Sequence, residues 1–310
     1  VLPIAAFTTL YHTVSGIVLK RYQRMAACGD CPREAKMVVD QMIAAVKEID
    51  PDFITRVGDD TLAQELLPEE RLFAELSERR VGYDERARFV ESFDRTLGDR
   101  WSLMTHHDAD AEKRLAGAVR EVFAVGDDAL SDDDAIAVVC DPARNRYLDD
   151  TLNMWEHSPL MRTLNHVTYS FKKRISHTGD SQEQRHRTTP ASRPIVRFTH
   201  TREPDYLEPP TITANEEAAT LYRSTMHLLW DTKNRLIAMG VPDEYACYIL
   251  PNALMVRYTQ TGSYLHFLHK WRLRSCFLAQ MEIYNCAYDE IMQVRAVHPR
   301  LGAYIGPPCF

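Results

Sequence analysis

Apolar residues recur every three or four positions in several long stretches of the chain. This spacing predicts amphipathic helices, because residues three and four apart share one helix face. The pattern predicts helices over residues 32–49, 110–123, 131–139 and 214–240, and one or two long helices over 263–299. Local signals support the ends of these helices: Pro32 suits a first turn, Ser131 with Asp134 forms a capping-box variant, and Gly240 and Pro299 are helix terminators.

Three short stretches instead favour strands. Residues 166–173 and 253–260 are rich in β-branched and aromatic residues. Residues 191–200 are a further candidate, which Pro194 restricts to an edge strand or to a strand's first residues. The intervening residues 176–187 predict a loop leading into one or two helical turns. A few strands among many helices indicate a helix-rich α+β fold.

An internal similarity suggests a repeat. Residues 1–28 align with residues 249–276 without a gap, and a small set of positions is identical. The identical pairs are Leu2 and Leu250, Pro3 and Pro251, Ser15 and Ser263, Arg24 and Arg272, and Cys28 and Cys276. We therefore expect residues 1–60 to be the C-terminal part of a first, incomplete repeat. Residues 61–150 are then a helical connecting region, and 151–310 form a second, more complete domain.

Composition restricts the possible classes of protein. The chain has 310 residues, 45% of them hydrophobic and 26% charged, which is ordinary for a soluble globular protein. A net charge of −7 argues against a general nucleic-acid binder. No apolar run reaches the roughly 18 residues of a membrane span. Seven cysteines without a dense framework favour a reduced, cytoplasmic compartment. The sequence starts without Met and stops abruptly, so we expect both ends to be cut from a longer protein.

The strongest candidate for chemistry is the triplet Arg185-His186-Arg187. Arginine side chains bind phosphate oxygens through two parallel hydrogen bonds, so such a triplet can hold a phosphorylated cofactor or nucleotide. Gln182 lies three residues earlier and would share a helical face with Arg185, and Ser192 adds a hydroxyl group. The alternative is a solvated basic patch without a ligand.

These residues resemble the signature of the flavin-dependent thymidylate synthases. In that family, a Gln precedes an Arg-His-Arg triplet by three residues, and a Ser and an Arg follow it, as Ser192 and Arg193 do here. The chain also contains an upstream His157, His166 before a strand, Leu250-Pro251, Arg274 and the run Ala-Gln-Met-Glu-Ile over 279–283. The resemblance covers residues 150–300, with a weaker half-copy at 1–50, and is greatest to a long, tandem branch of the family.

The resemblance implies a reaction. Such enzymes methylate deoxyuridine monophosphate to deoxythymidine monophosphate, with methylenetetrahydrofolate as carbon donor, FAD as carrier and NADPH as reductant of the flavin. Their sites form between subunits, which implies a homo-oligomer with a nucleotide monophosphate as substrate, and with neither nucleic acid nor membrane as partner. By position, the catalytic residues are Arg274, Ser192 and Gln182. The cofactor-binding residues are His157, Arg185, His186, Arg187 and His269, and the substrate-binding residues are Gln182, Arg187, Ser192, Arg193 and Arg274.

The chain departs from the family pattern at several positions. The loop between the triplet and Ser192 is shortened. An Arg that contacts the substrate phosphate falls on Cys247, and an Asn-x-Arg that contacts flavin falls on Ser263 and Leu265. His266, His269 or Arg272 are candidates to compensate. These losses leave two alternatives open: a catalytically degenerate homologue that serves as a structural or nucleotide-binding protein, and an enzyme of the same chemistry acting on another nucleotide.

We expect no metal site. Cys28 and Cys31 have a spacing found in metal sites, but only one such pair exists, so a plain loop is favoured. Cys309 near the end would matter only if more cysteines followed it. The stretch 106–110, His-His-Asp-Ala-Asp, is interpreted as a polar loop before a helix, because no second pair of ligands lies at a useful spacing.

Overall fold

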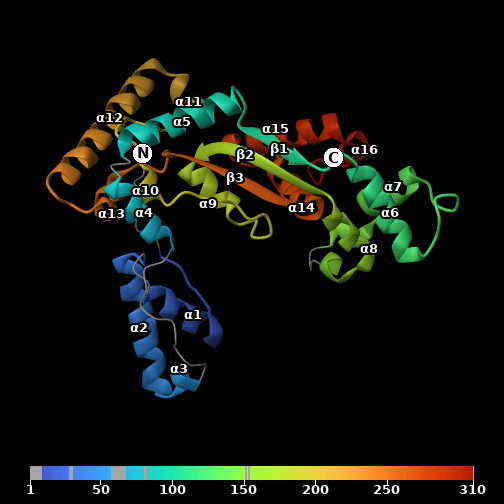
Figure 1. Cartoon of the computed structure of the whole chain (residues 1–310), viewed down its shortest axis with the longest axis horizontal. Helices are drawn as coiled ribbons and strands as arrows, with labels where there is room; N and C mark the ends of the chain where they lie inside the picture. The colour runs from blue at the N-terminus through green and yellow to red at the C-terminus, as the bar shows by residue number, and fades with distance from the viewer. Residues whose placement is uncertain are drawn as a thin grey trace.

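The computed structural model describes residues 9–27, 31–56, 68–79, 82–150, 152 and 154–309. It shows a helix-rich α+β fold in which one small sheet is surrounded by helices (Figure 1), as the sequence predicts. Among the described residues, no helix is both long enough and apolar enough to cross a lipid bilayer.

The sheet has three antiparallel strands in the order β1-β2-β3. They are β1 (Ser102–His107), β2 (Thr168–Ser176) and β3 (Met255–Ser263). The strands β2 and β3 pair along their full length, from Thr168 opposite Ser263 to Ser176 opposite Met255. The pairing of β1 with β2 is shorter, and its register shifts between Met104 and His106. The long β2–β3 pair is therefore the frame from which the neighbouring loops and helices are positioned.

Helices make up the remaining elements. The α-helices are α1 (Gly16–Ala26), α2 (Arg33–Ile49), α3 (Phe53–Arg56), α4 (Pro68–Glu78), α5 (Tyr83–Leu97), α6 (Ala111–Phe123), α7 (Asp132–Cys140), α8 (Pro159–Arg162), α9 (His177–Glu183), α10 (Val196–Thr199), α11 (Pro210–Thr213), α12 (Glu216–Ala238), α13 (Asp243–Ala246), α14 (Tyr264–Arg274), α15 (Met281–Val297) and α16 (Pro299–Gly302). The 3-10 helices are η1 (Arg146–Asp149), η2 (Met154–His157), η3 (Thr163–His166) and η4 (Cys247–Ile249).

The predicted helices and their caps are confirmed. The Ser131 hydroxyl accepts a hydrogen bond from the Asp134 amide at 3.1 Å at the start of α7. Past the end of α12, Gly240 has a φ of +89°, a left-handed conformation that favours glycine. The stretch 263–299 forms two helices, α14 and α15.

Three predictions of secondary structure are wrong. Residues 191–200 do not form a strand: only Ala191 makes an isolated bridge, to Gln260, and α10 follows. Pro190 and Pro194 flank the bridge, and proline cannot donate to a ladder. The second error is in residues 176–187, predicted as a loop leading into helical turns: the helix α9 comes first, and Arg185 lies in the turns beyond it, so it shares no helical face with Gln182. The third is in the segment 61–150, which was expected to be helical but contains β1. His106 and His107, interpreted as part of a polar loop, lie at the end of this strand.

The main hydrophobic core lies between the sheet and the helices α6, α7, α14 and α15. Its large aromatic side chains come from β2 and α14: Tyr169, Phe171, Tyr264, Phe267 and Trp271 are all fully buried. Phe267 and Trp271 stack at 5.1 Å between ring centroids, and Phe171 meets both edge to face. Because α14 is anchored through these rings, the polar residues on its other faces are held in fixed positions relative to β2.

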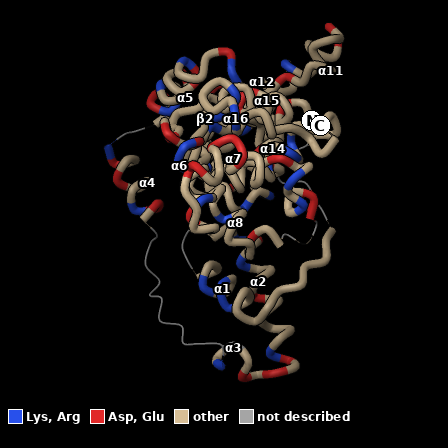
Figure 2. Tube along the Cα trace, turned by 90° about the vertical axis from the view of Figure 1, so that its right-hand side faces the viewer, with Lys and Arg blue, Asp and Glu red and all other residues tan. Residues whose placement is uncertain are grey.

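The amino-terminal helices α1, α2 and α3 form a small body beside this domain, as Figures 1 and 2 show. They have their own apolar cluster of Leu19, Ala26, Val39 and Ile43. A hydrogen bond of 2.6 Å from the Tyr248 hydroxyl to the Glu34 carboxylate joins this body to the main domain. Figure 2 also shows acidic and basic residues interspersed along the trace rather than gathered on one side.

Candidate functional site

The Arg-His-Arg triplet lies in a tight turn after α9. This helix begins at an N-cap, Ser176, whose hydroxyl accepts from the Gly179 amide at 3.0 Å. At its end the backbone continues in turns, with the His186 amide donating to the Glu183 carbonyl at 3.0 Å and the Thr189 amide to the His186 carbonyl at 3.2 Å. These turns place His186 inside the protein and leave its two arginine neighbours exposed.

Arg185 and Arg187 are available to bind a ligand. Both side chains are exposed, and within the described part of the chain neither has a hydrogen-bond or ion-pair partner. Most other arginines near the sheet are engaged: Arg257, for example, pairs with both Asp94 and Asp205. Two unpaired guanidinium groups on either side of one residue are a donor set suited to phosphate oxygens.

His186 and Arg274 form the polar centre of the site. The Arg274 Nε donates to His186 Nε2 at 2.9 Å. Because arginine can only donate, Nε2 of His186 carries no proton and the ring's proton lies on Nδ1. Burial, helped by nearby Lys270, Arg274 and His269, lowers the pKa of His186 to about 4, although Glu183 acts in the opposite direction. His186 is therefore neutral at pH 7 and acts as an acceptor for Arg274.

A second contact fixes Arg274. Its Nη2 donates to the Gln182 backbone carbonyl at 3.0 Å. The Gln182 side chain donates in turn to the Gln280 side-chain oxygen at 2.7 Å, and Gln280 donates to Glu282 at 2.6 Å. The structure therefore brings together Gln182, His186 and Arg274, three of the predicted site residues. Gln280 and Glu282 connect the base of the site to α15.

Beneath the triplet lies a fully buried network of charges. Lys173 from β2 and Lys270 from α14 each contact both Glu183 and Glu290, with N–O distances from 2.5 to 3.3 Å. Trp271 and Ser102 donate further hydrogen bonds to Glu290. Two lysines and two glutamates balance formally, and this arrangement satisfies charges that would be very costly to bury alone.

A cavity of about 460 Å³ adjoins the site on the α14 side. His269 and Trp155 lie on its wall with their ring centroids 6.3 Å apart, and His269 meets the His186 ring at 6.1 Å. The other lining residues are mainly apolar and include Met161, Leu265, Leu268 and Leu273. His157, predicted to lie near a flavin, is exposed on η2, two residues after Trp155. The cavity has the chemistry of a site for a flat aromatic ring.

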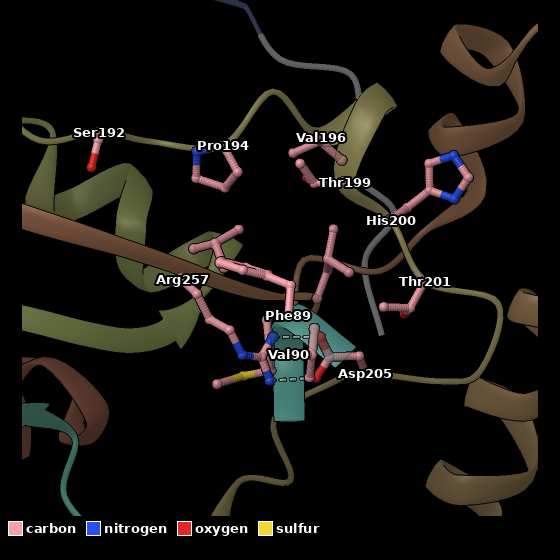
Figure 3. A pocket seen from close by; sticks show the side chains of 13 residues that line it. Phe89, Val90, Ser192, Pro194, Val196, Thr199, His200, Thr201, Asp205 and Arg257 are labelled. Atoms are coloured by element: carbon pink, nitrogen blue, oxygen red, sulfur yellow. Dashed lines mark hydrogen bonds and ion pairs between the residues drawn. The ribbon is translucent and has the colours of Figure 1, made fainter. Parts of the chain in front are cut away.

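Ser192 and Arg193 lie away from this centre. The Ser192 amide and hydroxyl both bond to the Thr259 carbonyl on β3, at 3.0 and 3.3 Å. Ser192 lines a different, mostly apolar cavity of about 180 Å³, which Figure 3 shows, with His200 at the other end and the Arg257–Asp205 ion pair between them. Neither His186 nor Arg274 lines that cavity.

Arg193 already has partners. Its Nε pairs with Asp180 at 2.7 Å, and its guanidinium lies 5.1 Å from the centre of the Tyr258 ring. Within one chain, therefore, the predicted substrate-binding residues Ser192 and Arg193 do not meet Arg274.

The residues that replace the family's usual ones have different surroundings in the structure. Cys247 is buried in an apolar cluster with Met226 and Trp230, and burial raises the pKa of its thiol to about 12. It lines neither of the two cavities described here. Leu265 is a wall residue of the 460 Å³ cavity.

The third altered position, Ser263, caps the junction of β3 and α14. Its hydroxyl donates to Asn165 at 2.7 Å and contacts His266 Nδ1 at 3.0 Å. Of the residues considered as replacements, His269 and Arg272 both line the large cavity, but the Arg272 guanidinium is bound to Asp149 and to the Leu148 carbonyl. His269 is the better placed of the two, because its ring makes no hydrogen bond or ion pair within the described residues.

The two stretches that were weighed as metal sites, around Cys28 and around His106, contain residues with other partners or residues outside the described part of the chain. Cys28 lies outside the described residues, so the pair with Cys31 is not visible, and Cys309 is exposed near the end. Asp108 accepts from the Thr168 amide and hydroxyl, both at 3.1 Å, and His107 packs edge to face on His298. Among the described residues, no three His, Cys, Asp or Glu side chains lie close enough to hold a metal ion.

Sequence reasoning missed several residues of the site. Trp155 belongs to no recognisable sequence motif. In the sequence, Lys173, Gln260 and Lys270 look like ordinary residues of two strands and a helix. The signal that could have revealed Lys173 is its place on a strand that is otherwise apolar on one face, with Tyr169, Phe171 and Ile175. A charged residue on the buried face of a strand needs a partner, which here comes from distant parts of the chain.

Comparisons with known proteins place the chain in a family. The family model of the thymidylate synthase complementing protein matches residues 102–300. A flavin-dependent thymidylate synthase of Saccharolobus solfataricus is 30% identical over 168 residues, which cover 52% of this chain and 64% of the relative. The synthase of Sulfurisphaera tokodaii is 29% identical over 168 residues, 52% of this chain and 65% of its own length.

A third relative, the flavin-dependent thymidylate synthase of Geobacter sulfurreducens, is 28% identical over 210 residues, which cover 66% of this chain and 87% of the relative. The chain thus spans slightly less than two thirds of the first two relatives. The matched region starts at β1, so it includes part of the segment expected to be a connecting region. With the family model covering more than half of its length, the chain belongs to the thymidylate synthase complementing protein family.

Proposed function

We propose that the chain binds FAD and methylates deoxyuridine monophosphate to deoxythymidine monophosphate, with methylenetetrahydrofolate and NADPH as co-substrates. The observation that carries the proposal is the pair of exposed, unpaired arginines Arg185 and Arg187 beside the His186–Arg274 contact. The names of the relatives support flavin dependence and thymidylate synthesis. The mainly apolar cavity lined by Trp155 and His269 supports a binding site for the ring system of a flavin.

Each residue has a distinct task in this proposal. Arg185 and Arg187 bind phosphate oxygens of cofactor or substrate. Neutral His186 and the Gln182 carbonyl hold the Arg274 guanidinium in one orientation, so that its remaining N–H groups face the uracil carbonyl and stabilise the negative charge that develops there. Trp155 and His269 flank the flavin ring and exclude water from one side. The flavin itself supplies the hydride.

We also propose that the functional form is a homo-oligomer. Ser192 and Arg193 do not reach Arg274 within one chain, which supports a site completed by another subunit. Phe277 and Leu278, shortly after Arg274, are 91% and 94% exposed and are suited to an interface between copies. A cytoplasmic location and a nucleotide monophosphate as the partner molecule are part of the same proposal.

A catalytically degenerate homologue is the second candidate. Buried Cys247 cannot replace a phosphate-binding arginine, and Leu265 offers a flavin no hydrogen bond. The two candidates differ in turnover. Both allow flavin binding, but only the first predicts that reduced flavin is consumed when methylenetetrahydrofolate and deoxyuridine monophosphate are added.

Neutralising both arginines is expected to weaken flavin binding. The variant with Arg185→Gln and Arg187→Gln should bind FAD at least about 100-fold more weakly, because each charged hydrogen bond to phosphate contributes roughly 1.5–3 kcal/mol and two are lost. FAD titration followed by visible absorbance measures this change. Arg100→Gln is the matched control, since Arg100 is also exposed but lies before β1. Unchanged affinity in the double variant would remove the triplet from the cofactor site.

We further propose that residues 1–60 are the C-terminal part of a first, incomplete synthase repeat, with 61–150 connecting it to the second. Helices α1 and α14 have 11 residues each, and α2 and α15 have 17 each. The members of both pairs start 248 residues apart, at Gly16 and Tyr264 and at Arg33 and Met281. Ser15 and Ser263 occupy the same N-cap position. The other identical pairs named from sequence include Leu2, Pro3 and Cys28, which lie outside the described residues.

The repeat predicts one flavin per chain rather than two. At the separation of 248 residues, Ala26 takes the place of Arg274, so the first repeat lacks the arginine on which the site is built. Its buried residues Leu19 and Ile43 match Phe267 and Ile291, which keeps the packing of the helix pair without the polar centre. Flavin content per chain, from absorbance after denaturation, tests this. Two flavins per chain would show that the first repeat has its own cofactor site.

A further inference from the structure

A chain of hydrogen bonds runs from the buried charges to the triplet. The chemistry of its end groups determines which atom donates and which accepts at each step. Gln260 lies in β3 and is completely buried. Its side-chain oxygen accepts from Lys173 Nζ at 2.8 Å and from Lys270 Nζ at 2.9 Å. An ammonium group can only donate, so this oxygen has to face the lysines. The amide nitrogen of Gln260 must then point the other way, toward the loop after the triplet.

That nitrogen binds Thr189. Gln260 Nε2 donates to the Thr189 hydroxyl at 2.8 Å and contacts its carbonyl at 3.3 Å. Since the Thr189 oxygen accepts from Gln260, its own proton is free to donate, and it does so to the His186 carbonyl at 3.0 Å. The Thr189 amide donates to the same carbonyl at 3.2 Å. The hydroxyl and the amide of Thr189 therefore both hold the His186 carbonyl in place.

Close packing fixes the same residue from a second side. A Cβ atom added to Gly262 of β3 would lie 2.9 Å from the Thr189 side-chain methyl group. Only glycine leaves enough room at this position, because contacts this short do not occur between real carbon atoms. Thr189 is thus buried against β3, and its side chain cannot turn away from His186 without breaking its hydrogen bonds.

We propose that Thr189 is a positioning residue: through it, the buried Lys173–Lys270–Gln260 cluster fixes the turn that buries His186 and presents Arg185 and Arg187 to the phosphates of the ligand. The inference rests on the proposed flavin site. It adds to that site a residue that touches neither cofactor nor substrate in the proposed arrangement, and acts only through the backbone of His186.

The direct test replaces Thr189 by Val, which keeps the shape of the side chain but removes the hydroxyl. FAD affinity of the Thr189→Val variant should fall about tenfold, which corresponds to the loss of about 1.4 kcal/mol, near the upper end of the range for one hydrogen bond. Thr189→Ser restores the hydroxyl and should restore the affinity. Thr188→Val is the matched control, because Thr188 is the exposed neighbour of Thr189 and should have no effect.

A second readout does not depend on flavin. In the parent protein, nitrogen-15 NMR should show one protonated and one bare ring nitrogen for His186, because Arg274 fixes its tautomer. In Thr189→Val the two shifts should move toward each other as the ring loses its fixed orientation. If the affinity and the tautomer signature are both unchanged in a folded Thr189→Val variant, the proposal is wrong.

The two readouts also separate this inference from the proposed function. A parent protein that binds no FAD contradicts the flavin site, while the NMR comparison of Thr189→Val with Thr189→Ser still decides whether Thr189 positions His186. Circular dichroism checks that each variant is folded. A tenfold loss of affinity that Thr189→Ser does not restore would also overturn the inference, because it would point to the changed methyl packing rather than the hydroxyl.

Discussion

Replacing Arg274 by alanine is expected to reduce formation of deoxythymidine monophosphate about 10²- to 10³-fold. The expected reduction follows from the role proposed for this guanidinium. Effects of this order result when one preorganised donor that stabilises the charge of a transition state is removed. The loss should appear mainly in kcat. Arg274 is partly exposed and makes hydrogen bonds only with Gln182 and His186 among the described residues, so the fold should survive its removal.

Lysine at the same position gives a sharper comparison. Arg274→Lys keeps the positive charge but loses the fork of donors that contacts both His186 and Gln182, so we expect activity between that of the parent and the alanine variant. The pH profile is informative as well. His186 is neutral above a pKa of about 4, so its acceptor role should leave no titration step between pH 6 and 8 in the parent. Full activity in Arg274→Ala would remove this residue from the reaction.

Replacing Glu290 by alanine is expected to destabilise the protein by about 3–5 kcal/mol. Glu290 is fully buried and binds Lys173, Lys270 and Trp271, and removing one member of a buried ion network leaves an excess of buried positive charge. Glu183 still contacts both lysines in this variant, so two buried ammonium groups are left to share one carboxylate. The free energy of unfolding, measured with a chemical denaturant, tests this. Glu91→Ala is the control: Glu91 is exposed and, among the described residues, pairs only with Arg95 one helical turn away, so its loss should cost less than about 0.5 kcal/mol.

The same network predicts how stability depends on pH. Burial alone would raise the pKa of Glu290 and of Glu183, but the two lysines outweigh burial and hold both pKa values below the usual value of 4.5. A carboxyl with a lowered pKa stabilises the folded state above its unfolded pKa. That contribution is therefore complete near neutral pH and declines as the pH falls below about 4.5. An equal stability for Glu290→Ala and the parent at pH 7 would contradict this account of the network.

The sequence predicted local features well, because they depend on neighbouring residues. The strand that became β3 and the helix that became α12 follow from periodicity and end signals that lie within a few residues. The triplet with Gln182 and Arg274 also emerged, because its residue types and spacing match a family. In contrast, β1 was missed: half of its residues are exposed and polar, and it is a strand only because it pairs with β2, about 70 residues away.

The supporting structure of the site depends on tertiary contacts that no pattern displays. Lys173, Glu183, Lys270 and Glu290 lie on four different elements, and only the folded sheet and helices bring their charges together. Pairing of this kind is what allows a strand or core helix to contain a lysine. Ser192 was misplaced for a different reason. Its hydroxyl has the chemistry that the motif requires, but the shortened loop places it against the edge of β3.

The most direct test of the central claim is product formation by the purified protein. The protein is mixed with FAD, NADPH, methylenetetrahydrofolate and deoxyuridine monophosphate, and deoxythymidine monophosphate is measured by chromatography, with Arg274→Ala in parallel. The account predicts product that needs all four small molecules and that nearly disappears in the variant. Flavin binding without any product would contradict it, and would identify the chain as a degenerate member of its family that retains the fold and the phosphate-binding arginines.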